Sequence, residues 1–302
     1  MAFGSGRFPA LVLGGASAFF LLMTALAVSF SVVDDELPFS SATREGKSRT
    51  VAALAALTER EAARWTPNAP FGHPAWFIDN APNYQLGILS ANARLGTELL
   101  DRLGRNRGTS SEDPDLRAAA GYLKFDGRIW LWGNGNVLPQ ATAESQYELA
   151  VRHLDAYNRR LSEGKAVFET RSDNLIDVLD RIALDLGSSA DSLRERTFAS
   201  NAGWFDFRAD DVFYGVKGRM YAYRILLDAI GQDFSSIIAE KRAQDVWSSM
   251  LRSMEVGAVM NPLIVSNGSQ DGLLMPSHLA AQGFYLKLAD TQLREMIDIL
   301  RK

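Results

Sequence analysis

Ionisable and nucleophilic side chains are spread along the chain without the spacings that define a reaction. The three histidines, His73, His153 and His278, are far apart, so no pair has the H-x-x-x-H spacing of a helical zinc site. Cysteine is absent, which excludes thiolate nucleophiles, disulfides and Cys-ligated zinc. The G-x-S-x-G elbow of serine hydrolases is also missing. We therefore predict no metal, no cofactor and no catalytic residue.

Acidic side chains offer the remaining chemistry. A glycosidase needs two carboxyl groups about 5–10 Å apart across a cleft. The candidates are Asp79, Asp126, Glu144, Asp206 and Asp211. Because the chain holds 36 acidic residues, the sequence does not single out a pair. The acids by themselves therefore do not indicate an enzyme.

The stretch from Trp65 to Gln85, WTPNAPFGHPAWFIDNAPNYQ, combines prolines, aromatic rings and amides. Its prolines oppose a continuous helix, because each lacks an N–H donor and restricts the residue before it. Long loops inside compact domains are uncommon and are often functional. We predict a loop here, and its candidate binding residues are Trp65, Trp76, Asp79, Asn80, Asn83, Tyr84 and Gln85.

Two interpretations of this loop stay open. In the first, exposed aromatic faces bind a sugar or a lipid, and the amides orient it. In the second, which we favour, the segment folds over a helical body and its aromatic rings are buried there. Exposure of Trp76 and Tyr84 around a cleft would favour the first interpretation, and burial would favour the second.

The elements that must position these residues are helices. Apolar residues recur at helical spacing through most of the chain, which predicts an all-α, bundle-like fold with long loops. Thr50 is the expected N-cap of the first helix, and Gly215 and Gly218 are expected to allow close packing. Gly187 is expected to end one helix, and Ser188 to begin the next. The predicted helices span residues 51–64, 86–103, 115–124, 143–161, 173–186, 188 onward, 210–230, 235–254 and 276–300.

One small hairpin is the alternative to a purely helical body. Between Asn261 and Met275, two short apolar runs flank the turn-forming pairs Asn267-Gly268 and Asp271-Gly272. Such pairs favour tight turns between strands, so we expect a hairpin-like flap there.

An uncharged apolar run from Phe8 to Val33 precedes the body. It is long enough to span a bilayer core of about 30 Å as a transmembrane helix. Arg7 before it places residues 1–7 in the cytoplasm by the positive-inside rule. We expect a bacterial inner-membrane protein with a stalk at residues 34–47 and a periplasmic domain at residues 48–302. Cleavage as a signal peptide after Ala25-Leu26-Ala27 is the alternative, and the length of the run favours a retained anchor.

The partners expected from the sequence begin with the bilayer, contacted by residues 8–33. Ala10, Gly14 and Ala18 lie four apart, which permits self-association through one helix face, although small residues are common in any membrane helix. The net charge of −4 makes a nucleic-acid surface unexpected. The remaining partner class is another protein of the cell envelope.

Several blocks of sequence resemble the bacterial DUF2333 family. The first is W-T-P-N-A-P…I-D-N-A-P-N-Y-Q-L-G, and the likeness continues at L-D-A-Y-N-R-R-L, at F-E-T-R-S-D-N-L and at P-S-H-L. It extends over nearly the whole chain. The resemblance implies a bacterial envelope protein tethered to the inner membrane, and it implies no activity and no site residue.

The sequence thus predicts a membrane-tethered periplasmic protein that acts as an envelope scaffold or interaction protein. Two alternatives stay open. One is a hydrolase or transferase of cell-wall glycan that uses the acids and amides of residues 65–85, and the other is a lipid-binding envelope protein.

Overall fold

A computed structural model describes residues 15, 17–26, 32–39, 44, 46–70, 72–73, 79–105, 112–132, 138–199, 206–262, 264–268 and 276–302. These residues form an all-α structure, as predicted, and they include no strand. The expected hairpin at 261–275 lies partly outside the described residues. Near it, an isolated antiparallel bridge pairs Asn267 with Ser277.

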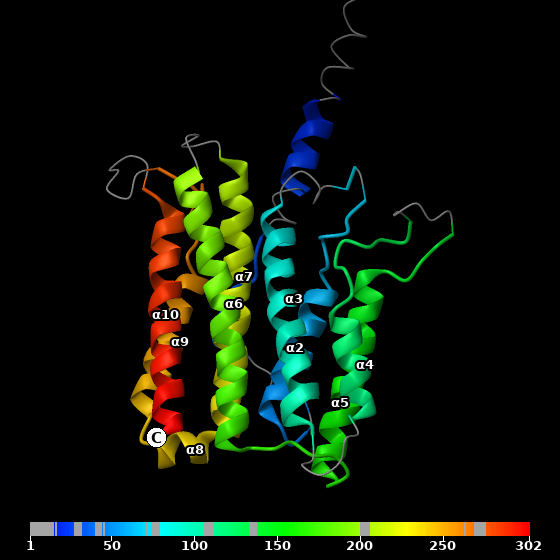
Figure 1. Ribbon diagram of the computed structural model, residues 1–302. Helices are drawn as coiled ribbons and strands as arrows, with labels where there is room; N and C mark the ends of the chain where they lie inside the picture. The colour runs from blue at the N-terminus through cyan, green and yellow to red at the C-terminus, as the bar shows by residue number, and fades with distance from the viewer. Residues whose placement is uncertain are drawn as a thin grey trace, which may run out of the picture.

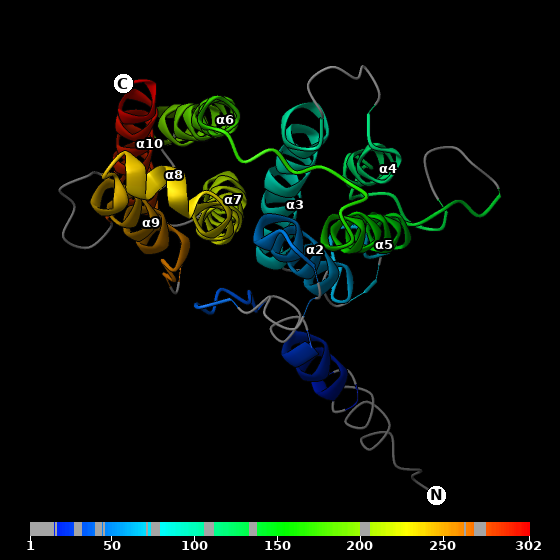
Figure 2. The same ribbon diagram turned by 90° about the horizontal axis from the view of Figure 1, so that it is seen from below.

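The helices pack in two groups that share one interface. In Figure 2, α6, α7, α9 and α10 gather on one side and α2 to α5 on the other, with α3 facing α7. The long helices stand side by side, so their ends form two opposite ends of the body (Figure 1). Their bounds are α2 Arg49–Ala62, α3 Asn80–Glu98, the π-turn η2 Leu99–Leu103, α4 Pro114–Leu123, α5 Ala143–Ser162, α6 Ser172–Ala199, α7 Phe207–Asp233, α8 Ser235–Glu240, α9 Gln244–Ala258 and α10 His278–Arg301.

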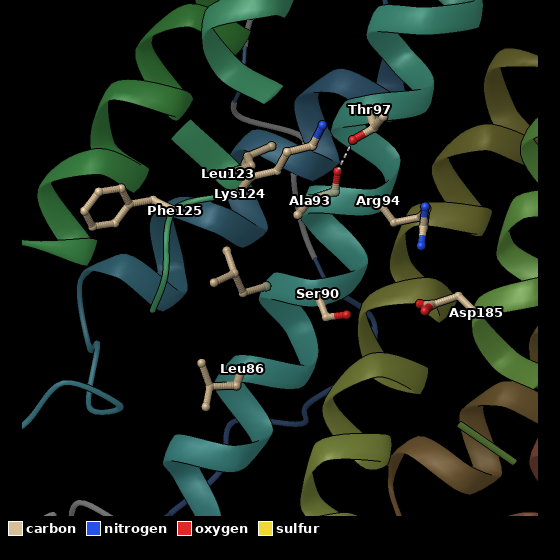
Figure 3. A pocket seen from close by; sticks show the side chains of 10 residues that line it. Leu86, Ser90, Ala93, Arg94, Thr97, Leu123, Lys124, Phe125 and Asp185 are labelled. Carbon is tan, nitrogen blue, oxygen red and sulfur yellow. Dashed lines mark hydrogen bonds between the residues drawn. The ribbon is translucent and has the colours of Figure 1, made fainter. Parts of the chain in front are cut away.

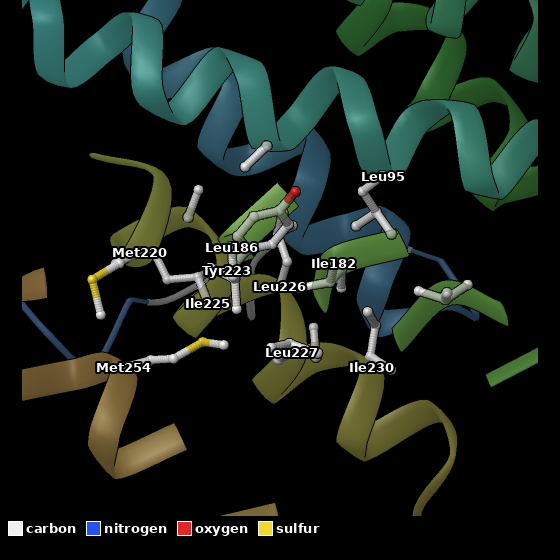
Figure 4. Packing of buried hydrophobic residues seen from close by; sticks show 14 of the residues in the cluster. Leu95, Ile182, Leu186, Met220, Tyr223, Ile225, Leu226, Leu227, Ile230 and Met254 are labelled. Carbon is white, nitrogen blue, oxygen red and sulfur yellow. The ribbon is translucent and has the colours of Figure 1, made fainter. Parts of the chain in front are cut away.

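Helix α7 forms the centre of the core. Residues on all of its sides are buried, including Phe213, Tyr221, Leu226 and Ile230, as expected for a helix surrounded by other helices. Figure 4 shows this packing against α3, α6 and α9, with Tyr223 among the apolar side chains. The Tyr223 hydroxyl donates to the Asp185 carboxylate at 2.6 Å, so its polar atom is satisfied inside the core.

Glycines allow α3 and α7 to approach backbone to backbone, as predicted for Gly218. A Cβ atom on Gly218 would lie 2.0 Å from the carbonyl oxygen of Tyr84, and one on Gly87 would lie 2.1 Å from that of Gly215. No side chain fits at either distance. The two groups of helices are therefore joined by a contact that requires glycine.

Several predicted boundaries are wrong, and the helix predicted at 235–254 is two helices, α8 and α9. The N-cap of α2 is Ser48 and not Thr50, since the Ser48 hydroxyl accepts from the Val51 N–H. The Asp233 carboxylate adds further acceptors for the Arg49 and Thr50 N–H groups, both at 2.9 Å, and stabilises the earlier start.

The predicted break at Gly187 is also wrong, because α6 runs without interruption from Ser172 to Ala199. A mid-helix glycine costs only about 1 kcal/mol relative to alanine. Burial of Leu186, Ser189 and Leu193 on one face of α6 offsets that cost. Tertiary packing thus outweighs the local signal for a helix end.

The N-terminal apolar run is described in part. Residue 15 and residues 17–26 are helical, and Phe19, Phe20, Leu21 and Leu22 are exposed there. No helix among the described residues is both long and apolar enough to cross a membrane. Residues 8–14, 16 and 27–31 of the predicted span, including Ala10 and Gly14, lie outside the described residues. Val32 and Val33 are described and are not helical, and Val33 packs against the core of the body.

Candidate functional site

Residues 34–39, here called the strap, lie against helices α2, α3 and α7. The Asp34 carbonyl accepts from the Tyr84 hydroxyl at 3.0 Å, and the Glu36 carbonyl accepts from the Tyr221 hydroxyl at 2.9 Å. These residues fall in the segment expected to form a stalk. The structure instead binds them to the body through the backbone itself.

A buried ion pair reinforces the strap. The Lys217 ammonium lies 2.6 Å from the Asp35 carboxylate and donates to the Met260 carbonyl at 2.8 Å. The Lys217 side chain is 0% exposed, and that of Asp35 is 23% exposed. Burial lowers the pKa of Lys217, and Asp35 partly opposes this shift. The charge of Lys217 therefore depends on the strap being in place.

Arg60 joins the strap to the end of α2. Its guanidinium donates to Glu61 at 2.5 Å and to the Tyr221 hydroxyl at 2.8 Å, and it lies 3.6 Å from Asp34. It also stacks 5.2 Å from the ring centroid of Phe39, a cation–π contact. Burial raises the pKa of Glu61, and Arg60 opposes that shift. The pair is thus a partly desolvated charge centre beside the strap.

A groove with a volume of about 1100 Å³ runs between the strap and the start of α3. We call it the strap groove. Its walls carry acids and arginines from the strap, the end of α2 and the start of α5. An indole and an imidazole, Trp65 and His73, come from the connection between α2 and α3. Its polar lining includes Asp34, Arg60, Glu61, Arg64, Gln85 and Glu144. This mixed lining suits an extended polar chain that has some apolar groups.

Three of the predicted binding residues line the strap groove. Trp65 is half-buried, donates to the Gly127 carbonyl at 2.8 Å and packs edge-on against Tyr147. Tyr84 is 1% exposed, so its ring offers no stacking face for a sugar. The side chain of Gln85 accepts from Thr66 and donates to the Arg64 carbonyl at 2.9 Å. These contacts make the three residues walls of the groove.

The other described candidates lie elsewhere, because α3 begins six residues earlier than predicted, at Asn80. Pro82 is compatible with this start, since the first turn of a helix needs no N–H donor. The early turns direct Asn83 towards α7, where its amide donates to Asp211 at 2.8 Å. Asn80 bonds the Tyr214 hydroxyl, and Asp79 bonds Asp211. Trp76 lies outside the described residues.

Asp79 and Asp211 form a hydrogen-bonded carboxyl pair next to Asp210. Burial raises the pKa of Asp211 to about 6, and its hydrogen bond and charge contact with Asp79 add to the shift. Burial raises the pKa of Asp210 to about 6, and the charges of Asp79 and Asp211 add to the shift. A glycosidase needs its two carboxyl groups about 5–10 Å apart on either side of a sugar, whereas Asp79 and Asp211 interact directly with each other. The arrangement therefore does not support the glycan-cleaving alternative.

The remaining sequence candidates have local partners. His153 lies 2.9 Å from Asp115, and His278 accepts from the Ser266 N–H at 3.0 Å. Glu144 accepts from Asn68 at 2.6 Å, and Asp126 caps a turn by accepting from the Arg128 N–H. Asp206 is the N-cap of α7 and pairs with Arg196.

Within the part of the chain that the structure describes, no group of three or more histidines and acids is arranged to hold a metal ion.

A second hollow of about 390 Å³ lies on the outer face of α3 (Figure 3). Arg94 and Lys124 are exposed at its rim, and Ser90 and Thr97 face it from α3. Its acid, Asp185, already accepts from Tyr223 in the core. This hollow is smaller than the strap groove and its one acid is engaged with the core, so the strap groove is the stronger candidate site.

Sequence reasoning missed Asp34, Asp35, Arg60 and Glu61 as site residues. In the sequence, Asp34 and Asp35 only mark the end of the apolar run. Arg60 and Glu61 belonged to a helix with no distinguishing motif. Their role becomes visible when the strap is placed against α2 and α7, and no spacing in the sequence reports that long-range contact.

Comparison with known protein families matches residues 64–202 and 194–302 to a family described as an uncharacterized protein conserved in bacteria, DUF2333. No curated protein and no solved structure matches the chain. The matched segments include α3, α7 and the groove wall at Trp65 to Gln85, and they confirm the resemblance drawn from the sequence. The chain belongs to the DUF2333 family.

Proposed function

We propose that this chain is a membrane-tethered protein of the bacterial envelope that holds a partner protein at the strap groove. Residues 8–33 anchor it in the inner membrane, residues 1–7 lie in the cytoplasm and residues 34–302 lie in the periplasm. The observation that carries the proposal is the strap, since the segment directly after the anchor forms one wall of the groove.

The exposed apolar side chains of the N-terminal helix support the tether. Phe19, Phe20 and Leu21 are 64%, 71% and 68% exposed. A run of large exposed apolar residues on one helix is costly in water and favourable in lipid. A bilayer is the environment that accounts for them.

The lining of the strap groove supports binding rather than chemistry. Its charges are already paired with one another, as in Arg60 with Glu61 and Arg64 with Asp34 at 3.2 Å. With Trp65 beside them, these paired charges form a surface that can bind an extended peptide segment through its hydrogen-bonding and charged groups. A scaffold protein needs such a binding surface and a fixed position of its body. The strap supplies the fixed position.

In-cell photocrosslinking tests the partner. The crosslinker p-benzoylphenylalanine replaces Arg64, which lines the groove and has a side chain 69% exposed. Arg152 on α5, with a side chain 73% exposed, is the matched control. We expect a defined protein adduct from position 64 and none from position 152. The same adducts from both positions, or none from either, would contradict the proposal.

A further inference from the structure

Four large apolar side chains that are at least half exposed lie in segments that connect or end the helices of the body. Trp132 and Leu138 lie between α4 and α5, Phe198 lies in the last turn of α6, and Ile264 lies between α9 and α10. Their exposed fractions are 50%, 77%, 77% and 53%. Exposed apolar residues are ordinary when scattered, so their placement decides whether they have a role.

All four belong to one end of the body, here called the anchor end. Asn267, close to Ile264, donates to the Arg196 carbonyl in the last turn of α6 at 3.0 Å. Gly127, in the connection between α4 and α5, accepts from Trp65 at the edge of the strap groove. The N-terminal helix leaves the body from this same end (Figure 1).

The opposite end differs. It consists of the start of α2, the described parts of the connections between η2 and α4 and between α5 and α6, and the turns around α8. None of the large apolar side chains exposed among the described residues lies there. Leu184, 60% exposed, lies midway along α6 between the two ends. Apolar exposure is thus concentrated where the N-terminal helix departs.

We propose that the anchor end rests on the lipid bilayer, with Trp132, Leu138, Phe198 and Ile264 in the zone between headgroups and acyl chains. This inference rests on the proposed tether. Val33 already packs against the core of the body, so only the short segment between Leu26 and Val33 separates the N-terminal helix from the anchor end.

Asp34 is held by Tyr84 in the second turn of α3, which leaves no slack between the bilayer and the anchor end. Tryptophan prefers the membrane interface, where its apolar ring and its N–H are both satisfied.

Site-directed spin labelling of the full chain tests the contact. Because the chain contains no cysteine, single substitutions introduce one label each. The labels at the anchor end are Leu138→Cys, Phe198→Cys and Ile264→Cys, and the opposite end carries Lys165→Cys and Glu240→Cys. Leu22→Cys reports on the N-terminal helix. Each variant is reconstituted into vesicles of phosphatidylethanolamine and phosphatidylglycerol, and collision rates with oxygen and with a water-soluble nickel complex give the depth of the label.

We expect the three anchor-end labels to be several-fold more accessible to oxygen than to nickel, with the opposite-end labels showing the reverse. If the label at 22 is in hydrocarbon but the anchor-end labels match those at 165 and 240, the bilayer contact is overturned and the tether stands. If the label at 22 is in water, the tether fails, whatever the anchor-end labels report. If the anchor-end labels are shielded from both reagents, a protein covers this end and the bilayer contact is overturned.

A charge substitution adds a matched control within α6. Phe198→Glu places a carboxylate at the proposed interface, whereas Leu184→Glu places one at another exposed position of the same helix, midway between the two ends. We expect Phe198→Glu to raise nickel accessibility at a label on 264 several-fold and Leu184→Glu to leave it unchanged. Equal effects from both variants would overturn the proposal, because they would reflect the helix and not the bilayer.

Discussion

Replacing Asp35 by asparagine tests whether the strap is held by the buried charge of Lys217. The substitution keeps the shape of the side chain and removes the carboxylate, while Lys217 stays 0% exposed. Breaking a buried ion pair costs about 3–5 kcal/mol when one charge is left without its partner. Asp35 is 23% exposed and is therefore partly screened, so we expect a loss of about 2–3 kcal/mol of unfolding free energy at pH 7.

The pH dependence follows from the pKa of Lys217. Burial already lowers that pKa below 10.5, and Asp35 limits the shift. Without Asp35 the pKa of Lys217 in the folded state falls further below 10.5. The unfolded state then binds the Lys217 proton more tightly than the folded state over a wider pH range. The loss of stability caused by Asp35→Asn should therefore be largest at pH values below the pKa of Lys217 in the folded variant. It should shrink as the pH rises towards 10.5.

A double-mutant cycle with Lys217→Met isolates the pair. Methionine has a similar length and no charge, and Asp35, 23% exposed, stays in contact with water. Lys217→Met alone should therefore cost about 1 kcal/mol, the value of the lost hydrogen bond to the Met260 carbonyl. The Asp35→Asn/Lys217→Met variant should match Lys217→Met and should be more stable than Asp35→Asn. As a control, Asp191→Asn removes an exposed pair with Arg194 and should cost less than about 0.5 kcal/mol.

Urea unfolding of the full chain in detergent micelles, followed by tryptophan fluorescence, measures these changes. Hydrogen exchange at the amides of residues 34–39 shows in parallel whether the strap is released. The reasoning is refuted if Asp35→Asn is no less stable than Lys217→Met, or if the double variant is as unstable as Asp35→Asn.

Three further changes follow from the packing. Gly218→Ala should destabilise the body by about 2–3 kcal/mol in urea unfolding, because its Cβ would lie 2.0 Å from the Tyr84 carbonyl oxygen; a near-neutral result would contradict the α3–α7 contact. Gly187→Ala should stabilise it by up to about 1 kcal/mol, because no atom lies within 4 Å of that Cβ and the site is inside a helix; destabilisation would argue for a break in α6. Asp211→Asn should raise stability by about 1 kcal/mol at pH 7 and leave it nearly unchanged at pH 4, because burial raises the pKa of Asp211 to about 6 and makes the wild type lose stability as pH rises from about 4 to 6; equal effects at both pH values would refute the raised pKa of Asp211.

Helical spacing was enough to predict the fold class and most of the helices. Apolar residues on one face, as in the helix containing Leu154 and Leu161, report burial directly. The same local logic failed at Gly187, where the glycine and Ser188 signal a helix end that packing overrides. It also fails at Asn80, because proline opposes a helix by local rules, whereas the first turn of α3 tolerates Pro82.

The candidate site was predictable in one part. Trp65, Tyr84 and Gln85 belong to a distinctive stretch, and they do line the strap groove. The opposite wall comes from Asp34 and its neighbours, which lie far from them in sequence. Their pairing with Lys217 and Tyr221 depends on how α7 crosses the body, and no local pattern encodes that crossing.

The contacts of the strap bear on the position of the body. The backbone of Asp34 and Glu36 and the side chain of Asp35 fix the chain directly after the proposed anchor to α3 and α7. A flexible stalk would let the body turn freely about the anchor, whereas these bonds couple any rotation of the anchor to the core around α7. The strap also forms a wall of the groove, so a ligand in the groove would contact the coupling segment itself. Binding there and release of the strap are therefore linked, and a partner that prefers the bound strap must stabilise the Asp35–Lys217 pair by the same free energy.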